Sequence, residues 1–596
     1  MQTPSWTVYP HLPLEKLEAF ESAGIDRYLA QILYNRGNRT FAQMRAFIDA
    51  CYEDTSDPLT LVDMPRAVKR IQRALVQGEH ITVYGDYDAD GVTSSSLLFR
   101  ALRVLKQPQA RLDFHIPHRL TDGCGLHIKA IDELKARGTS LIITTDCASS
   151  DVGQVAHARL LGIDVVITDH HHPPLQRPDA CAMVNPWRSD YDYTGDYGER
   201  YFCGVGIAFK LVQALYRAYR RPQGEEIALL DLVAIGAIAD IAPLVGENHT
   251  LVRLGIQQLN STQKPGLLAL IHTANLQLGR IRERDIAYAL APRINAAGRM
   301  KNASIAFNLL VTDSHEEATN YVAELEQLNA ARQQETEELM RNVREQAQSQ
   351  ASKQVVLVSG DAWHEGLIGL VAGKLAEEIN KPVLVVSNDK QSKFSRGSAR
   401  SQHGFNIIAA LHGFAHHLER YGGHAQAAGF TISTERVEHL HAYLLDWKEE
   451  GIATLPQLIE GAESGGVVAE EESKLLVGSQ MVDLVVSRLE HLDYSFYKLL
   501  RTLSPFGASN PEPTFKMKGL RLLDKWVSTN GRSLRLKLGS ATGPTQRMGT
   551  LSRGADLLTA LKNVTHVDIV FRLDSSEDES KQDVWLRIVH LQATQK

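Results

Sequence analysis

Three apolar, β-branched runs separated by helical patterns constrain the fold of this chain more than any other feature. The runs are ITVY (81–84), LIITT (141–145) and VVIT (165–168). Segments with helical patterns, such as SSSLLFRALRVL and VGQVAHARLLG, lie between them. Strands that alternate with helices are joined by right-handed crossovers, which gives a parallel sheet covered by helices. We therefore expect an α/β domain in this part of the chain.

Each of these strands ends in residue types that bind metal ions. The residues that follow the three strands are, in order, Asp86, Asp88 and Asp90; Asp146; and Asp169, His170 and His171. The carboxyl ends of parallel strands share one edge of the sheet, and ligands bind in the crevice outside that edge. We therefore expect these side chains to converge at one site.

Two simpler interpretations of these residues compete with a metal site. A single Asp after a strand is usually a helix N-cap or a turn former, and a His pair is more often hydrogen-bonded at the surface. Three neighbouring strand ends that include a His-His pair favour the metal site. Crowded carboxylates repel one another unless cations neutralise them. Mixed Asp and His ligands suit Mn²⁺ or Mg²⁺ better than Zn²⁺, and two ions can share a carboxylate.

The helical run DLVAIGAIADIAPL (231–244) offers a further ligand. It is apolar except for Asp231 and Asp240, and Asp240 stands near its end, before Pro243. Burying a carboxylate in such a run without a partner is costly. Asp240 is therefore expected to be a metal ligand, with an N-cap for the following turn as the alternative.

A second group of motifs carries cations and small residues instead of carboxylates. RGSARSQHGFN contains Ser398 and Arg400, and RYGGHAQAAGF contains His424. PHRLTDG and PRINAAGRM contain Arg119 and Arg299. Small residues let backbone N–H groups approach an anion, and Arg can bind a phosphate through two hydrogen bonds. The alternatives are ordinary turns, solvated side chains and surface salt bridges.

The rest of the chain indicates further domains. Residues 316–350 lack Gly and Pro and are rich in helix formers, which predicts a long, largely solvated helix. A second α/β unit follows, and short β-like runs after residue 510 suggest a small antiparallel barrel of the oligonucleotide-binding (OB) type. The expected divisions are a helical extension (1–75), a catalytic α/β domain (76–315), a connecting helix (316–352), a second α/β domain (353–440), and a connector with the barrel (441–596).

Composition narrows the setting of the protein but leaves its function open. The five cysteines form no CxxC pair, which argues for a reducing compartment and against a disulfide framework or a zinc ribbon. The first residues lack the pattern of a signal peptide, and no apolar run reaches membrane-spanning length. A cytoplasmic protein is therefore expected. The net charge of −6 does not exclude nucleic acid, because one basic surface is sufficient for binding.

The order of the motifs resembles a known superfamily. DYDADG, TTDC, TDHH and GAIADIAPL resemble the four motifs of the DHH phosphoesterases, and WHEGLIG, GSARS and GGHAQAAG resemble the DHHA1 domain that accompanies them. NPW, CGVGIAFKL, RINAAGRM and SPFGASNPEP are similar to the RecJ family of exonucleases in particular. The resemblance covers nearly all of residues 75–596 and is most specific before residue 440.

The resemblance implies roles for individual residues. Two Mn²⁺ or Mg²⁺ ions would be held by Asp88, Asp90, Asp146, His170 and Asp240, with Asp86 adjoining. Asp146 would bridge the ions, His171 would face the scissile phosphate, and His424 would contact a phosphate from the second domain. The pocket for a terminal 5′ phosphate would consist of Arg119, Arg299, Ser398 and Arg400.

The activity that the resemblance implies is 5′-to-3′ exonuclease action on single-stranded DNA by two-metal hydrolysis, in DNA repair and recombination. Single-strand-binding protein and a RecQ-like helicase are the protein partners it suggests, and it suggests no membrane. Two alternatives stay open, namely a phosphoesterase of short oligonucleotides or cyclic dinucleotides and a non-catalytic replication-fork protein. The chain departs from the family pattern at Cys124, Ala148 and Ser509, where an aromatic residue, Gly and Gly are usual.

Overall fold

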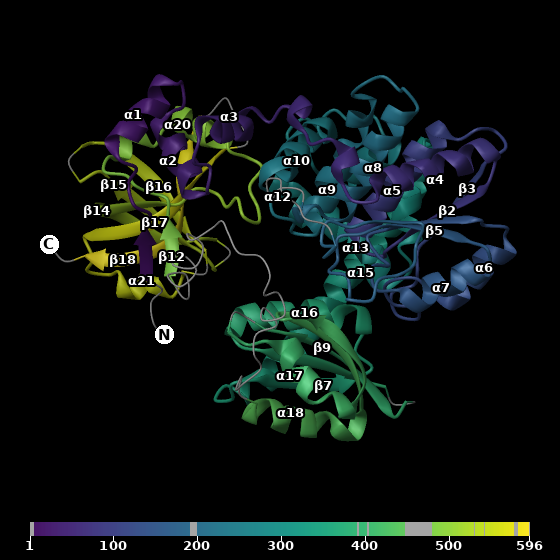
Figure 1. Cartoon of the computed structure of the whole chain (residues 1–596). Coiled ribbons are helices and arrows are strands. Elements are labelled where there is room, and N and C mark those ends of the chain that lie inside the picture. The colour runs from purple at the N-terminus through teal and green to yellow at the C-terminus, as the bar shows by residue number, and fades with distance from the viewer. Residues whose placement is uncertain are drawn as a thin grey trace.

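The computed structural model divides into three bodies (Figure 1). These are a core domain built on the sheet β2–β6, a second domain built on the sheet β7–β11, and a barrel near the C-terminus. The structure describes residues 5–190, 200–389, 392–401, 404–447, 479–529, 531–541, 543–552, 554–576 and 582–594. Most of the predicted connector, residues 448–478, lies outside the described residues.

The core domain contains the predicted parallel sheet. Its strands are β2 (His80–Gly85), β3 (Arg111–His115), β4 (Leu141–Thr145), β5 (Asp164–Thr168) and β6 (Ala182–Val184). Their order is β3-β2-β4-β5-β6, and all the pairings are parallel. The carboxyl ends of β2, β4 and β5 are therefore neighbours at one edge of the sheet, as the sequence predicts.

The core domain also contains helices. They are α4 (Met64–Gln77), α5 (Ala89–Leu105), α6 (Ile128–Ala136), α7 (Val152–Leu160), α8 (Gly204–Ala218), α9 (Leu230–Ala239), α10 (Gly246–Leu259), α11 (Pro265–Thr273), α12 (Glu283–Asp285), the π-helical turn η5 (Ile286–Leu290), α13 (Ala291–Met300) and α14 (Ser304–Val311). Some of them, including α4, α5, α7 and α8, pack on this sheet, and others pack on these helices.

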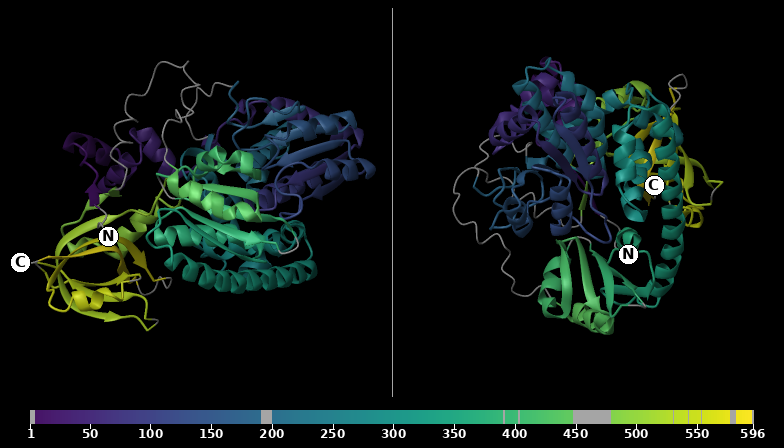
Figure 2. Two further views of the ribbon diagram at one scale, coloured as in Figure 1. Left: turned by 90° about the horizontal axis from the view of Figure 1, so that it is seen from below. Right: turned by 90° about the vertical axis from the view of Figure 1, so that its right-hand side faces the viewer.

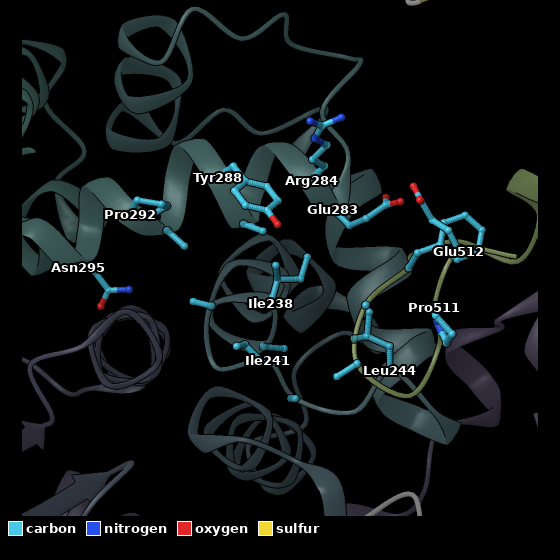
Figure 3. Close-up of a pocket in the computed structure, with 18 of the residues that line it drawn as sticks. Ile238, Ile241, Leu244, Glu283, Arg284, Tyr288, Pro292, Asn295, Pro511 and Glu512 are labelled. Carbon is cyan, nitrogen blue, oxygen red and sulfur yellow. The ribbon is translucent and has the colours of Figure 1, made fainter. Parts of the chain in front are cut away.

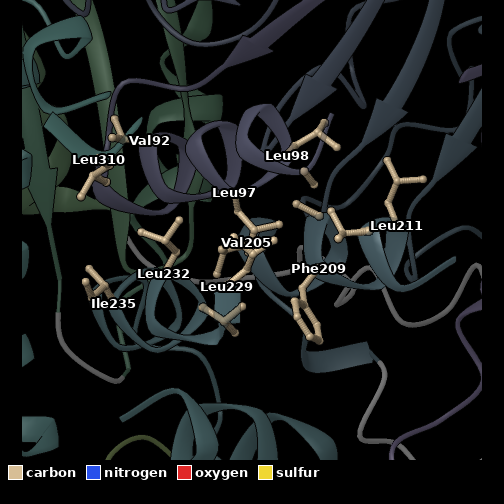
Figure 4. Close-up of a cluster of buried hydrophobic side chains, with 14 of the residues drawn as sticks. Val92, Leu97, Leu98, Val205, Phe209, Leu211, Leu229, Leu232, Ile235 and Leu310 are labelled. Carbon is tan, nitrogen blue, oxygen red and sulfur yellow. The ribbon is translucent and has the colours of Figure 1, made fainter. Parts of the chain in front are cut away.

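The packing of α5, α8 and α9 fixes the site edge of the core domain (Figure 4). Leu97 of α5, Val205 and Phe209 of α8, and Leu232 and Ile235 of α9 are all fully buried in one hydrophobic cluster. Burial of an aliphatic or aromatic side chain of this size contributes roughly 1.5–3 kcal/mol. The cluster therefore holds the start of α5, the start of α8 and the end of α9 in a fixed relation, and three of the candidate site residues, Asp88, Asp90 and Asp240, lie at the ends of α5 and α9.

A single helix, α15 (His315–Gln348), joins the core domain to the second domain (Figures 1 and 2). The long helix is confirmed, but it is less solvated than its composition suggests. Its few apolar residues form one buried stripe, which includes Val322 and Leu325 in the first half and Leu339 and Val343 in the second. The two halves pack on different domains. Among the described residues, no helix is both long and apolar enough to cross a membrane.

The second domain has a mixed five-stranded sheet. Its elements are β7 (Val356–Asp361), α16 (Glu365–Ile379), β8 (Val383–Asn388), β9 (Phe394–Arg400), α17 (Ile407–Gly413), β10 (Leu418–His424), β11 (Ala427–Ser433) and α18 (Val437–Asp446). The strand order is β10-β11-β9-β8-β7, with β7 parallel to β8 and the other pairs antiparallel. The RGSARS and RYGGH motifs therefore lie on strands, although their glycines are more typical of turns.

The C-terminal unit is a closed barrel, which confirms the predicted OB-like fold. Its strands are β13 (Leu484–Val485), β14 (Phe515–Val527), β15 (Leu534–Gly539), β16 (Gln546–Leu551), β17 (His566–Ser575) and β18 (Val584–Thr594). The order is β13-β14-β15-β16-β18-β17, and pairing of β14 with β17 closes five strands into a barrel. Two pairs differ from the antiparallel expectation, because β13 is parallel to β14 and β16 is parallel to β18.

The N-terminal segment belongs to the barrel in three dimensions. It contains the helices α1 (Leu14–Ser22), α2 (Arg27–Asn35) and α3 (Phe41–Asp49), and a strand that the sequence did not predict, β1 (Ser5–Val8). Strand β1 pairs with β12 (Ser479–Val482), and α2 and α3 share one hydrophobic core with the barrel and with α20 (Tyr494–Arg501). Figure 1 shows these helices beside α20. The barrel therefore needs both ends of the chain.

Several polar contacts attach the barrel to the core domain. Arg253 Nη1 of α10 donates to the carbonyl oxygens of Ile48 (2.6 Å) and Thr502 (3.1 Å). Arg501 of α20 pairs with Glu283 of the core domain at 2.8 Å. Arg253 of α10 thus contacts α3 and the segment after α20 together. Because α2 and α3 share a hydrophobic core with the barrel, removing the C-terminal residues alone would expose the apolar faces of α2 and α3.

The Ala148 and Ser509 departures both lie where the backbone favours Gly. Ala148 has φ +84° and Ser509 has φ +59°. Residues with a Cβ are strained in this region by about 1–2 kcal/mol, whereas Gly is not. Ala148 is buried and its methyl group packs, but Ser509 is exposed. The strain is therefore not offset by burial at Ser509.

We predict that Ser509→Gly stabilises the protein by roughly 0.5–1 kcal/mol, because relief of strain exceeds the entropy that Gly adds to the unfolded chain. The measurement is the melting temperature, which should rise by about 1–3 °C. Ser349→Gly is the matched control, because Ser349 is not in the left-handed region (φ −66°), and it should lower the melting temperature. A decrease in both variants would show that Ser509 carries no strain.

Candidate active site

The predicted metal-binding residues converge at the site edge of the core sheet. Oxygen atoms of Asp86, Asp88 and Asp146 lie within 4.8 Å of one another, and Asp146 forms a second such group with His170 and His171. A third group consists of Asp90, Asp240 and Cys203. We call the six predicted ligands the acidic cluster, which comprises Asp86, Asp88, Asp90, Asp146, His170 and Asp240.

Helix starts orient two of these carboxylates. Asp88 is the N-cap of α5 and accepts a hydrogen bond from Gly91 N at 3.0 Å. Asp90 accepts from Gly204 N (2.7 Å) and Val205 N (2.9 Å) at the start of α8. The capping interpretation and the metal-site interpretation therefore apply to the same residues. A carboxylate has about four acceptor positions, so a capping bond leaves others for a cation.

Asp146 lies at the centre of the cluster. Its backbone is left-handed (φ +64°), and its side chain is buried against Gly204, where an added Cβ would come within 2.5 Å of Asp146 Cβ. Asp146 Oδ1 is buried and accepts no hydrogen bond, although His170 Nε2 lies 3.1 Å away. A buried carboxylate oxygen without a partner is costly. This oxygen fits a divalent cation that would supply the missing interaction.

The two adjacent histidines have opposite protonation behaviour. Burial, reinforced by the neighbouring His171, lowers the pKa of His170 to about 4, so His170 is neutral and can coordinate a cation. Burial opposes the charge on His171, but its 2.8 Å hydrogen bond to Asp169 and the nearby charges of Asp169, Asp86 and Asp240 together outweigh burial and raise the pKa to about 9. His171 is therefore protonated at neutral pH and exposed beside the cluster.

Asp169 supports His171 and does not belong to the acidic cluster. Burial would raise the pKa of Asp169, but hydrogen bonds from His171 and Ser149 bring it to about 2. Asn185 adds a second support, since its Nδ2 donates to the carbonyl oxygen of His171 at 2.8 Å. The chain of contacts fixes the ring of His171 in one orientation.

Asp240 is in the cluster, but it is not the fully buried carboxylate of its apolar run. It follows α9 with part of its side chain open to solvent, while the surrounding residues still desolvate its carboxyl group, and its neighbours in space are Asp90 and Cys203. The buried carboxylate of this run is Asp231, which is satisfied by Lys264 (2.7 Å) and Thr262 (2.9 Å). Asp231 is therefore structural, and Asp240 is available to a ligand.

The acidic cluster is electrostatically unfavourable by itself. Burial, reinforced by Asp88, raises the pKa of Asp86 and of Asp90 to about 7. Burial and Asp90 raise the pKa of Asp240 to about 8 and that of Asp146 well above its usual range. Five carboxylates and one neutral imidazole form a hard donor set that suits Mn²⁺ or Mg²⁺. Cations would neutralise the charge that raises these pKa values.

A second cluster of predicted residues faces the first from both domains. We call Arg119, Arg299, Ser398 and Arg400 the arginine cluster. Arg400 Nη1 lies 3.1 Å from Ser398 Oγ on β9, and Arg299 Nη1 donates to Gly366 O at the start of α16 (3.2 Å). Burial, reinforced by Arg119, lowers the pKa of Arg299 to about 10; burial and Arg119 also lower the pKa of Arg400. The three guanidinium groups are thus close enough to repel one another, as expected of an anion site.

A glycine of α16 gives the arginine cluster its space. A Cβ at Gly369 would come within 3.1 Å of Ser398 Oγ and 3.2 Å of Arg400 Nη2. The helix backbone can therefore lie directly against these two side chains. Free N–H groups and the dipole at the start of a helix favour anions, and the start of α16 lies at this cluster.

His424 lies on the second domain, near the histidine segment of the core domain. It ends β10 in an exposed position on the second domain. Burial lowers the pKa of His172, and the nearby His424 and His171 lower it further, so His424 faces the histidine segment of the core domain. The structure brings His424 to this segment but not into the acidic cluster.

Several residues that were not predicted as ligands or phosphate contacts also shape the site. Asn295 Oδ1 accepts from Ala89 N at 3.0 Å, and Tyr87 lies under the guanidinium group of Arg119 at 4.7 Å. Two thiols also adjoin the ligands, since Cys124 Sγ lies 3.4 Å from Asp86 Oδ2 and Cys203 lies beside Asp90. Asn295 and Cys203 lie within motifs that carried the family resemblance, RINAAGRM and CGVGIAFKL, but no spacing rule singled them out.

Three protein-family models match the chain. They are the DHH family, N-terminal domain (residues 80–237), the DHHA1 domain (residues 352–450) and the RecJ OB domain (residues 482–590). The three matches correspond to the core domain, the second domain and the barrel.

Curated relatives match over most of the chain. Single-stranded-DNA-specific exonuclease RecJ of Bacillus subtilis is 36% identical over 83% of this chain, and the match spans 59% of that longer protein. The RecJ of Salmonella typhimurium is 30% identical over 87% of this chain and 88% of its own length. The crystal structure of RecJ from Thermus thermophilus in complex with Mn²⁺ matches with a TM-score of 0.80 and 26% identity, over 99% of this chain and 80% of that one. The same Thermus protein in complex with Mg²⁺ matches with a TM-score of 0.74 and 25% identity, over 99% and 79%.

We predict that the metal-free protein becomes less stable as pH rises from about 6.5 to 8. The carboxyl groups of Asp86, Asp90 and Asp240 keep protons in the folded state up to pKa values of about 7, 7 and 8, whereas the unfolded chain has already lost them. His171 acts in the same direction, because it retains its proton up to about pH 9 when folded. Each proton retained only by the folded state costs about 1.4 kcal/mol of stability per pH unit.

The measurement is the melting temperature in a chelator across this pH range, repeated with Mn²⁺. The cation should remove most of the decline, because it replaces the protons in neutralising the cluster. Asp146→Asn should flatten the decline without metal and should lose the stabilisation by Mn²⁺. A melting temperature that is constant or rises with pH in the chelator would contradict the electrostatic account.

Proposed function

Because the chain belongs to the RecJ family of single-stranded-DNA-specific exonucleases, we propose that it removes nucleotides from the 5′ end of single-stranded DNA by metal-dependent hydrolysis. The observation that carries the proposal is the meeting of an acidic cluster and an arginine cluster at the junction of two domains. In a strand that ends in a 5′ phosphate, the terminal phosphate would lie at the arginine cluster. The first phosphodiester would lie at the acidic cluster, where bound cations would meet its negative charge.

We propose that the acidic cluster holds two divalent cations, Mn²⁺ or Mg²⁺. Asp88, Asp90, Asp146, His170 and Asp240 are the proposed ligands, with Asp86 adjoining and Asp146 shared between the ions. The unpartnered oxygen of Asp146 and the neutral ring of His170 support this assignment. When bound, such ions supply Lewis-acid stabilisation of the phosphate and lower the pKa of a water molecule.

We propose that His171 contacts the scissile phosphate. Its ring is protonated at neutral pH, is held by Asp169, and is exposed at the acidic cluster. A fixed cation near the phosphorus stabilises the negative charge that develops on the phosphoryl oxygens. His424 would contribute a further phosphate contact from the second domain.

The polarity of cutting would come from the arginine cluster. Arg119, Arg299, Arg400 and Ser398 are proposed to bind a terminal 5′ phosphate, which is more strongly charged than an internal one. Gly369 of α16 lies directly against Ser398 and Arg400, and in this proposal α16 would block a strand that continues past the terminal phosphate.

A cavity of about 620 Å³ supports a path for the rest of the strand (Figure 3). It begins beside Asp240, where Ala239 and Ile241 line it, and ends at Arg572 and Arg587 of the barrel. Tyr288 of η5 lies in its wall and is 80% exposed. Exposed aromatic rings and arginines bind single strands without regard to sequence, through stacking and phosphate contacts. An enzyme of short oligonucleotides would have no use for this extension or for the barrel.

We also propose single-strand-binding protein and a RecQ-like helicase as partners. An enzyme that degrades single strands depends on other proteins to unwind duplex DNA and to keep it single-stranded. The test is whether either protein copurifies with this chain after nuclease treatment has removed DNA. If neither protein does, single-stranded DNA remains the supported partner.

The function is tested by digestion of end-labelled single strands with and without Mn²⁺. We expect a 5′-labelled strand to release its label at once as a mononucleotide, and a 3′-labelled strand to shorten progressively. Duplex DNA should resist, and the reaction should need the metal. Release of the 3′ label first, or cutting within a circular strand, would contradict the proposal.

We predict that Arg400→Ala removes most of the preference for a 5′ phosphate over a 5′ hydroxyl. A charge-assisted contact contributes ~1.5–3 kcal/mol, or roughly ten- to a hundredfold in the rate ratio. The measurement is kcat/KM on both substrates for wild type and variant. Equal slowing of both substrates would mean that Arg400 binds an internal phosphate, and polarity would then need another explanation.

A further inference from the structure

A loop of the core domain brings Arg119 to the second domain. The loop, residues 118–123, is closed by a hydrogen bond from Asp122 N to His118 O (2.9 Å) and by one from His118 N to Asp122 Oδ2 (2.8 Å). Arg119 projects from it over the ring of Tyr87. The position of this loop therefore decides how close Arg119 comes to the rest of the arginine cluster.

Electrostatic repulsion opposes this position. Arg299 comes from α13 of the core domain and Arg400 from β9 of the second domain, and both are partly buried cations near Arg119. Like charges at short range in a poorly solvated site repel strongly. In the absence of a bound anion, some attractive contact must therefore hold the loop against the second domain.

Arg396 supplies such a contact. Its Nη1 donates to the carbonyl oxygen of Leu120, the residue after Arg119, at 3.0 Å, and also to Glu365 Oε2 at 2.5 Å. Leu120 belongs to the core domain, whereas Arg396 and Glu365 belong to β9 and α16 of the second domain. The contact thus joins the two domains directly next to Arg119, and Glu365 balances the charge of Arg396.

The register of β9 couples this contact to the arginine cluster. Side chains two apart on a strand lie on the same face. Arg396, Ser398 and Arg400 therefore project from one face of β9. The strand that contributes two residues to the cluster also holds the loop that contributes Arg119.

We propose that Arg396 is a positioning residue that latches the 118–123 loop and so sets the affinity for a terminal 5′ phosphate. The proposal rests on the proposed function for its kinetic readout. Arg396 does not touch the phosphate. It keeps Arg119 beside Arg299 and Arg400 before the phosphate binds. The free-energy cost of ordering the loop is therefore not subtracted from the binding free energy of the phosphate.

The test compares Arg396→Ala and Arg396→Lys with a matched control. Arg344→Ala is the control, because Arg344 is also 49% exposed and pairs with Glu378 on the same helix α16, but it contacts α16 from α15. Kinetics are measured on single strands with a 5′ phosphate and with a 5′ hydroxyl, over a series of salt concentrations. Hydrogen exchange of the segment 117–126 is measured in parallel on the full chain.

For Arg396→Ala we expect KM for the 5′-phosphorylated strand to rise about tenfold, the effect of losing one charge-assisted contact, with kcat unchanged. The hydroxyl-ended strand should be nearly unaffected, and exchange of segment 117–126 should become faster. Lys can also donate to the Leu120 carbonyl, so Arg396→Lys should restore most of both properties. Arg344→Ala should resemble wild type.

Two results would overturn the proposal. If Arg396 binds DNA directly, Arg396→Ala would slow both substrates and reduce the slope of log KM against log salt by about 0.7, the value for one lost contact to a single strand. If Arg396 has no role in the loop, exchange of segment 117–126 would not change. The exchange result does not depend on nuclease activity, so it separates failure of the latch from failure of the proposed function.

Discussion

The crowding of carboxylates at one edge of a parallel sheet is the constraint on which the rest of the structure depends. Strands β2 and β4 end in Asp86 and Asp146, and the helix ends around them add Asp88, Asp90 and Asp240. Burial and mutual repulsion raise the pKa values of most of these groups. A fold that keeps them together needs a rigid base, which the buried contacts of α5, α8 and α9 provide. It also needs its negative charge neutralised, which retained protons or bound cations can do.

The positive charge is placed on the other side of the same junction. The acidic cluster belongs wholly to the core domain, whereas the arginine cluster is shared, with Arg119 and Arg299 from the core domain and Ser398 and Arg400 from β9. Helix α15 connects the two domains as one rod, and it packs its apolar stripe on both. The distance between the clusters is therefore set by this helix and by the contacts of Arg396 and Arg299 across the junction.

The sequence was sufficient where local pattern and function coincide. Alternation of strands and helices predicted the core sheet, and the strand ends identified Asp86, Asp146 and His170 together, because parallel strands must end at one edge. Asp240 was selected as the buried carboxylate of its run, whereas the fully buried one is Asp231, since a run of sequence cannot show which of its two carboxylates faces a partner. Asp231 has Lys264, which lies 33 residues away. The raised pKa of His171 also depends on distant residues, because Asp86 and Asp240 add to the effect of Asp169.

Long-range packing accounts for the other differences. Nothing in residues 5–49 indicates that β1 would pair with β12 or that α2 and α3 would complete the core of a barrel far along the chain. Strands β9 and β10 contain residues of low strand propensity, such as Gly. They form because β9 is paired with β8 and β11 on its two sides, and β10 is paired with β11 on one side. The departures at Ala148 and Ser509 acquire a physical meaning only from their backbone angles.

The central claim is that the acidic cluster is a two-cation site in which Asp146 is shared. Titration with Mn²⁺ followed by electron paramagnetic resonance tests it most directly, since two ions about 3.5–4 Å apart give a spin-coupled signal that separate ions do not. The account predicts two Mn²⁺ per chain with a coupled spectrum in the wild type, and at most one uncoupled Mn²⁺ in Asp146→Ala. A wild-type protein that binds no Mn²⁺, or an Asp146→Ala variant with an unchanged coupled spectrum, would contradict the account.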